Sequence, residues 1–221
     1  MPGSWELVRR KSVLCAFLHV DVTSVAWSLG LRNLLPPEMA MMPIAGMPYD
    51  HGRNVACMKA LECGADYLFF LDSDVVPPRD AVLRLMAHDK PLISGMYCRR
   101  SPPHAVPVMI KNGTWFTAFR PGEVVEVDLV GAGCLLIRRD LLEKMPPQSP
   151  DRGRHWFDWR VDCAGIRPQG DCLSEDFTFC KHVRERMGIP ILVDTSVHCK
   201  HVGLAQSTLG RFEPCETTPV T

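Results

Sequence analysis

The stretch Asp66-Tyr67-Leu68-Phe69-Phe70-Leu71-Asp72-Ser73-Asp74 decides the fold. Residues 67–71 form an apolar, aromatic-rich run that has the length of a strand rather than a helix. The run ends in two acids separated by one serine, and carboxylates at the end of a buried strand must be solvated, paired or bound to a cation. The two acids can turn toward one point, which suits a hard divalent cation with oxygen ligands. The alternative is that one acid caps the following helix and the other is solvated.

The length of 221 residues is enough for one large domain or two small ones with a hydrophobic core. The 25 basic residues are matched by 25 acidic ones, so the net charge favours no nucleic-acid partner. No run approaches the roughly 20 apolar residues that cross a bilayer, and we expect no transmembrane segment.

The ten cysteines are scattered along the chain, and no two have CxxC spacing. Cys163, Cys172, Cys180 and Cys199 match the spacing of no usual zinc module. We therefore expect reduced thiols in a cytoplasmic protein.

The first hundred residues alternate between strand and helix patterns. Strands are predicted at residues 12–20, 39–45, 67–71 and 91–96, and helices at residues 25–35, 53–63 and 78–88. Residues 46–52 are rich in turn formers and predict a loop. Such alternation implies a parallel sheet covered by helices, with any ligand site at the carboxyl ends of the strands.

The pattern changes after Tyr97 and indicates a mixed or antiparallel second half. Asn112-Gly113 lies between two short apolar runs, which is a strong hairpin signal. The predicted strands are residues 106–110, 115–119, 124–130, 133–138 and 191–197, and the predicted helices are residues 140–145 and 175–187. Residues 146–154, with the sequence PPQSPDRGR, predict a mobile loop.

Three further features place glycine or polar residues beside these elements. Gly131-Ala132-Gly133 lies between two strands, where glycine lets the backbone approach a ligand; a simple bulge is the alternative. Ser174-Glu175-Asp176 begins a helix, where acids also favour the helix dipole without any catalytic role. His198 or His201 follows the last strand, and a lone histidine is more often packed or solvated than a ligand.

In this order, the features resemble those of the GT-A glycosyltransferases, and most closely the short, soluble, family-two-like members. The resemblance covers roughly residues 12–203. It rests on Arg53-Asn54, Asp72-Ser73-Asp74, the run Gly131-Ala132-Gly133-Cys134-Leu135-Leu136-Ile137-Arg138-Arg139, Glu175-Asp176 and His201-Val202-Gly203. It implies a single α/β domain of the GT-A fold. A Rossmann-like nucleotide-binding half with a mostly parallel central sheet (residues 12–100) would merge with a smaller mixed-sheet acceptor half (residues 101–203), followed by a tail (residues 204–221).

The resemblance also implies roles for individual residues. Asp74 would hold Mn²⁺ or Mg²⁺, Asp72 would reach the ribose or a metal-bound water, and His201 matches the terminal metal-ligand position better than His198. Asp176 falls where inverting members keep their catalytic base, and Glu175 beside it would be the second catalytic residue. The residues that bind the nucleotide sugar would be Asp21 at the base, with Arg53, Asn54, Asp72, Ser73 and Gly133.

The aromatic patch at residues 155–159 offers flat apolar faces for a sugar ring. His155, Trp156 and Trp159 would bind the acceptor there, and plain core packing is the alternative. We therefore expect a glycosyltransferase that moves one sugar from a UDP- or GDP-linked donor to a hydroxyl of a glycan or small acceptor. The sequence names neither the sugar nor the base.

Other functions remain open at this point. One is a retaining enzyme on the same scaffold, in which Asp176 positions rather than deprotonates. Another is a nucleotidyltransferase, although residues 21–24 are not the glycine-rich phosphate loop that such an enzyme needs. The last is a non-catalytic sugar-nucleotide-binding or lectin-like module.

Overall fold

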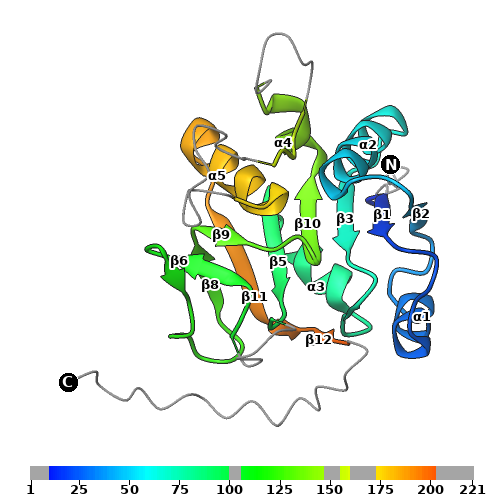
Figure 1. Ribbon diagram of the computed structural model, residues 1–221, viewed down its shortest axis with the longest axis horizontal. Coiled ribbons are helices and arrows are strands. Elements are labelled where there is room, and N and C mark those ends of the chain that lie inside the picture. Colours follow the sequence, from blue (N-terminus) through cyan, green and yellow to red (C-terminus); the bar gives the residue numbers. More distant parts are fainter. Residues whose placement is uncertain (1–9, 100–105, 147–154, 160–172, 203–221) are drawn as a thin grey trace, which may run out of the picture.

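The computed structural model describes residues 10–99, 106–146, 155–159 and 173–202, which form an α/β fold (Figure 1). The helices are α1 (Val25–Arg32), α2 (Tyr49–Glu62), α3 (Ala81–Ala87), α4 (Arg139–Lys144) and α5 (Glu175–Met187). The strands are β1 (Val13–Leu18), β2 (Ala40–Ile44), β3 (Tyr67–Leu71), β4 (Val75–Val76), β5 (Leu92–Met96), β6 (Met109–Lys111), β7 (Thr114–Trp115), β8 (Val124–Val127), β9 (Leu129–Val130), β10 (Cys134–Arg138), β11 (Ile191–His198) and β12 (Lys200–His201).

The large sheet has seven strands in the order β2-β1-β3-β10-β5-β11-β8. β1 pairs in parallel with β2 and β3, as the alternating pattern predicts, and β11 from the second half of the chain pairs in parallel with β5. β10 runs antiparallel between β3 and β5, and β8 runs antiparallel at one edge. Strands from the second half of the chain thus complete the same sheet. Because Cys134 pairs with Leu71, the residues that precede β10 lie beside those that follow β3.

Helices cover both faces of this sheet (Figure 1). α2, α4 and α5 pack with Leu68 and Phe70 of β3, and α1 and α3 pack with Tyr67, Phe69 and Leu71. Successive side chains of a strand point to opposite faces, so covering both faces buries all five residues of β3. This explains why the sequence of β3 is continuously apolar.

α2 begins at Tyr49, before its predicted start at Arg53, so the expected loop at residues 46–52 is partly helical. Gly52 lies within the helix, where a Cβ atom would stand 3.0 Å from Leu18 Cδ2 and 3.1 Å from Ile44 Cγ2. The glycine therefore allows a close approach of the helix to the sheet and does not form a turn.

The Asn112-Gly113 hairpin is confirmed, and both residues have positive φ, 52° and 75°. Its strands are shorter than predicted. The predicted strand at residues 124–130 divides into β8, in the large sheet, and β9, in a three-stranded sheet of order β7-β6-β9. This smaller antiparallel sheet leads directly into Gly131.

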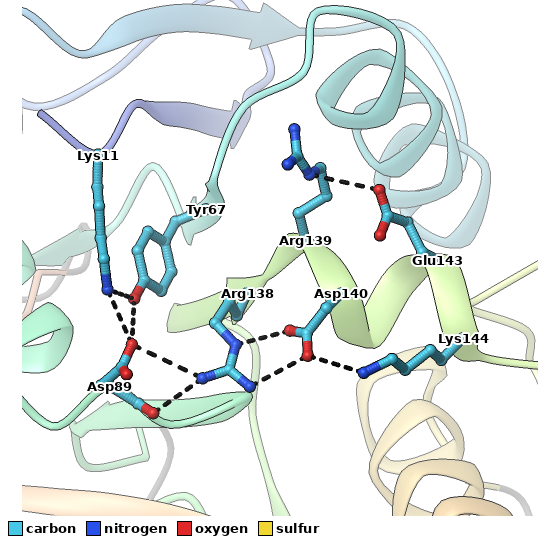
Figure 2. A network of polar contacts seen from close by, with 8 residues as sticks. All are labelled: Lys11, Tyr67, Asp89, Arg138, Arg139, Asp140, Glu143 and Lys144. Carbon is cyan, nitrogen blue, oxygen red and sulfur yellow. Dashed lines mark hydrogen bonds and ion pairs between the residues drawn. The ribbon is translucent and has the colours of Figure 1, made fainter. Parts of the chain in front are cut away.

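At the amino end of β3, opposite the edge that carries Asp72, a polar network joins β1, β3 and β10 (Figure 2). Lys11 Nζ lies 3.0 Å from Tyr67 Oη and 2.9 Å from Asp89 Oδ1. Arg138 Nε lies 2.6 Å from Asp140 Oδ1, and Arg138 Nη1 donates to the Asp89 carbonyl at 3.0 Å. The hydrogen bonds from Arg138 lower the pKa of Asp140. The network fixes the last residue of β10 beside the start of β3, which supports their register.

Two further features concern the described residues. No helix within the described ranges is long and apolar enough to cross a bilayer. The described cysteines are free thiols. Of the four cysteines considered above as a set, Cys163 and Cys172 lie outside the described residues.

Candidate functional site

Asp72 follows β3 directly, and its carboxylate pairs with a buried arginine of α2. Arg53 Nη2 lies 3.0 Å from Asp72 Oδ1, and the guanidinium lies over the rings of Phe70 and Phe157, 5.1 and 5.9 Å from their centroids. The indole N–H of Trp27 donates to the Asp72 carbonyl at 2.8 Å. The charge at the end of this buried strand is therefore matched internally, and Asp72 is held in place by protein groups.

Arg53 also reaches α5, so one guanidinium joins the acids of two separate motifs. Arg53 Nε lies 3.2 Å from Glu175 Oε1. Burial raises the pKa of Glu175, Asp176 raises it further, and Arg53 partly offsets the rise. Burial alone would lower the pKa of Arg53, but Asp72, Glu175 and Asp176 raise it, so the guanidinium stays charged. Glu175, predicted beside the catalytic base, is thus engaged in a buried ion pair.

The Gly131-Ala132-Gly133 turn lies against Asp72. The backbone N–H of Asp72 donates to the Gly133 carbonyl at 3.1 Å, and the Gly133 N–H donates to the hydroxyl of Tyr97 at 3.0 Å. A Cβ atom on Gly133 would stand 2.8 Å from Tyr97 Cζ and 3.0 Å from Asp72 Oδ2. The close approach expected of this glycine is therefore made to Tyr97 and Asp72. Tyr97 is buried, and no motif in the sequence points to it.

Asp176 joins the start of α5 to the same turn. Its Oδ2 accepts the Ala132 N–H at 3.3 Å, and its Oδ1 accepts the Phe177 N–H at 2.8 Å and a short hydrogen bond from the Ser174 hydroxyl. The side chain is partly exposed. These contacts hold the candidate base beside the turn and leave it within reach of a ligand.

Asp74 and His201 meet through a two-residue ladder that the sequence analysis did not predict. β12 pairs with β4, so that His201 lies opposite Val75, and the Val202 N–H donates to the Asp74 carbonyl at 2.7 Å. His201 Nε2 lies 3.1 Å from Asp74 Oδ2, and its Nδ1 lies 2.8 Å from the Cys98 carbonyl oxygen. Figure 1 shows β12 at one edge of the molecule, away from α4, which carries part of the network of Figure 2.

These two side chains fit a divalent cation in part. A metal-binding histidine usually donates its second ring N–H to a carbonyl or carboxylate, and His201 does so to Cys98. Within the described ranges, however, no three His, Cys, Asp or Glu side chains are grouped as a metal site. The Asp72 carboxylate is turned toward Arg53 and Gly133. A cation held by Asp74 and His201 would take its other ligands from water and from substrate phosphates, as Mg²⁺ commonly does.

The remaining residues predicted to bind a nucleotide sugar have different surroundings. Asp21 follows β1 with an exposed side chain and a φ of 65°. Ser73 lies in the turn between Asp72 and Asp74. Asn54 is buried, and its amide bonds the backbone of Trp156 and Phe157 at 2.7 to 3.0 Å. Asn54 therefore holds the 155–159 segment against α2.

The aromatic patch divides between core and surface. Trp156 is 2% exposed, and its indole N–H donates to the Leu142 carbonyl at 3.0 Å. Core packing, the alternative for this patch, therefore describes Trp156, and a contact of this residue with an acceptor stays a prediction. Trp159 is 43% exposed and His155 is half-buried.

Some predictions concern residues outside the described ranges. The mobile loop at residues 146–154 is one of them, apart from its first residue. Gly203 and the tail at residues 204–221 are others.

Comparison with known proteins shows the fold alone. No protein-family model matches the sequence, and no curated protein matches it. The structure is similar to the crystal structure of A197 from STIV, with a TM-score of 0.61 and 18% sequence identity. The similarity covers 87% of this chain and 86% of that one. The two chains thus share an architecture over most of their length, and a shared fold does not fix the activity.

Proposed function

We propose that this chain is a metal-dependent glycosyltransferase of the GT-A type, which moves one sugar from a nucleotide-diphosphate donor to an acceptor hydroxyl. One observation carries the proposal: residues from five separated motifs converge beside the end of β3. Arg53 pairs with Asp72 and Glu175, Gly133 packs against Asp72, Asp74 contacts His201, and Asp176 bonds the turn that contains Gly133.

The donor side of the proposal rests on Asp74, His201 and Asp72. Asp74 and His201 would hold Mn²⁺ or Mg²⁺, which as a Lewis acid takes up negative charge on a diphosphate leaving group. Asp72 is held by Arg53 and the Trp27 indole, so its carboxylate is in place to meet a ribose or a metal-bound water. The UDP- or GDP-linked donor would lie along the carboxyl ends of the parallel strands, with its base near Asp21.

The acceptor side rests on Asp176. A general base must lie within hydrogen-bond reach of the hydroxyl that it deprotonates. Asp176 is partly exposed, and backbone N–H groups and the Ser174 hydroxyl hold it at the start of α5. A carboxylate held in this way is positioned to accept the proton of a glycan or small-molecule hydroxyl, which is the arrangement of an inverting enzyme.

A second candidate follows from the same contacts. Both oxygens of Asp176 accept hydrogen bonds from the protein itself. The residue would then shape the Gly131-Ala132-Gly133 turn and take no proton. That role suits a retaining glycosyltransferase or a non-catalytic sugar-nucleotide-binding module.

A thermal-shift screen of nucleotide sugars, with and without Mn²⁺, tests the proposal. A donor at a hundred times its dissociation constant should stabilise the protein by about 2.7 kcal/mol. The donor found in this way is then tested for Mn²⁺-dependent hydrolysis. Binding without hydrolysis or transfer would favour the non-catalytic module, and a screen in which no nucleotide sugar stabilises the protein would contradict both candidates.

A further inference from the structure

An exposed tryptophan lies close to the candidate base in a position that the roles above do not use. Trp115 ends β7 and is 40% exposed. Its ring centroid lies 6.4 Å from that of Phe177, and the two rings are tilted by 57°. Phe177 follows Asp176 in α5 and donates its backbone N–H to Asp176 Oδ1 at 2.8 Å. The indole thus packs on the side chain of the residue that follows the candidate base in the chain.

The smaller sheet brings Trp115 to this position. Ile110 pairs with Trp115 on one side and with Leu129 on the other. β9 then continues into the turn whose Ala132 N–H bonds Asp176. β9 also packs against α5, and Figure 1 shows the two side by side. The turn and the start of α5 therefore hold Asp176, and the hairpin lies beside them through the pairing of β6 with β9 and the contact of Trp115 with Phe177.

The guanidinium of Arg99 lies beside the Trp115 ring. Arg99 Cζ lies 5.1 Å from the centroid of the Trp115 ring, which is within the range of a cation–π contact. The Arg99 backbone is fixed by its N–H, which donates to the Val106 carbonyl at 2.8 Å. In the described part of the chain no carboxylate pairs with Arg99. Its planar guanidinium therefore offers donors that match a carboxylate or a phosphate.

We propose that Trp115, Phe177 and Arg99 form the acceptor subsite, and that the acceptor is an acidic saccharide. The sugar ring would bury the C–H groups of one face against the aromatic side chains, and its carboxylate or phosphate would pair with Arg99. That this saccharide is the acceptor rests on the proposed function. That an acidic saccharide binds beside Asp176 is independent of the proposed function. Trp159 is about as exposed as Trp115, but among the described residues it makes no hydrogen bond to Asp176 and no ring contact with Phe177.

Binding is measured by calorimetry on the full chain, without donor or metal, for three probes. Methyl glucuronide carries a carboxylate, glucose 6-phosphate carries a phosphate, and methyl glucoside is neutral. We expect at least one acidic probe to bind at least tenfold more tightly than the neutral one, and the better of the two identifies the anion. Equal binding of all three probes, or no binding of either acidic probe, overturns the proposal.

Variants separate the ring contact from the charge. Trp115→Ala should lower the affinity for the preferred acidic probe at least tenfold, and Trp115→Phe should recover part of the lost affinity. Arg99→Gln should remove the preference for the acidic probe over the neutral one. Leu83→Ala, which truncates a similarly exposed side chain on α3, should bind like the parent. Parental binding by Trp115→Ala, or a loss in Trp159→Ala instead, overturns the proposal.

A measurement of donor hydrolysis on the same protein tests the glycosyltransferase activity separately from saccharide binding. If the parent protein binds an acidic saccharide but hydrolyses no nucleotide sugar with Mn²⁺, the subsite is supported and the proposed glycosyltransferase activity is contradicted. A parent chain that hydrolyses a donor but shows no preference for an acidic saccharide would contradict the subsite alone.

Discussion

His201 Nε2 lies 3.1 Å from Asp74 Oδ2, while His201 Nδ1 lies 2.8 Å from the carbonyl oxygen of Cys98. A carbonyl can only accept a hydrogen bond, so Nδ1 carries a proton and Nε2 of the neutral ring is an acceptor. Two acceptors at 3.1 Å repel each other unless a proton or a cation lies between them. The two side chains therefore share a proton or, as we propose, hold a cation.

Removing the Asp74 carboxylate tests the metal site. Asp74→Ala should abolish Mn²⁺-dependent donor binding without unfolding the protein, because the residue lies past the buried part of β3. His201→Ala should weaken Mn²⁺ binding less, since it removes a neutral ligand. Titration calorimetry measures both. Asp80→Ala, which removes an exposed acid before α3, should bind Mn²⁺ and donor like the parent. Unchanged Mn²⁺ and donor affinities in Asp74→Ala would show that the metal assignment is wrong.

Arg53 should be important for stability. Arg53→Met leaves the carboxylates of Asp72 and Glu175 without their buried cation, and breaking a buried pair costs about 3–5 kcal/mol. Urea unfolding measures the loss. Arg138→Met is the matched control, because Arg138 pairs with Asp140 near the surface, where an ion pair contributes about 0–1 kcal/mol. Similar losses in the two variants would contradict the bridging role of Arg53.

Tyr97 should connect stability to donor binding. Tyr97→Phe removes the hydroxyl that accepts the Gly133 N–H, and an unpaired buried donor costs about 1–3 kcal/mol. Because Gly133 packs on Asp72, we also expect weaker donor binding. Tyr67→Phe is the control, since its hydroxyl contacts Lys11 and Asp89 at the opposite edge of the sheet. Donor affinity should fall only in Tyr97→Phe, and equal affinities in the two variants would exclude a role for Tyr97 at the site.

Asp194 in β11 should make stability depend on pH. Burial alone would raise its pKa, but hydrogen bonds from Ser196 and His88 lower it overall, below the ordinary 3.8. A carboxylate with a lowered folded-state pKa contributes stability above its unfolded pKa and loses it as pH falls through the folded value. The stability advantage of the parent over Asp194→Asn should thus shrink as the pH falls below about 4. Urea unfolding at several pH values checks this, and an advantage that grows in acid would contradict it.

Burial patterns made most of the fold predictable from the sequence. β3 and α5 were predicted with the bounds that the structure has, because a strand covered on both faces is continuously apolar and α5 has clear capping residues. Two-residue strands such as β4 and β12 have no periodicity to detect. Their pairing, which places His201 beside Asp74, follows only from the assembled sheet.

The site was predictable where its residues lie within motifs and was missed elsewhere. The Asp72, Asp74 and Asp176 motifs could be located because acids at element ends are visible locally. Tyr97 could not, since a hydroxyl that reaches Gly133 from another strand leaves no local signal. For Trp156, the sequence shows an aromatic residue in a polar segment, and only the packing against Asn54 and Leu142 shows that it is buried.

Asp176 is the residue at which catalytic and structural roles compete most closely. Asp176→Asn has one oxygen where Asp176 uses two, so its amide nitrogen must face either the Ala132 or the Phe177 N–H. We expect a stability loss of about 1–3 kcal/mol for the donor left unpaired. If Asp176 is the base, sugar transfer should fall by about 10²–10⁴-fold while donor binding stays unchanged, because the base acts on the acceptor.

Glu175→Gln is the internal control for this prediction. Neighbouring helix residues point about 100° apart, and Glu175 contacts Arg53 while Asp176 contacts Ala132. Glu175→Gln weakens the buried pair with Arg53, so it should lower stability and affect transfer less than Asp176→Asn. Transfer rates and urea unfolding are measured for both variants with a competent acceptor. Transfer by Asp176→Asn within about threefold of the parent, well short of the loss expected for a general base, would leave Asp176 only its structural role at the turn.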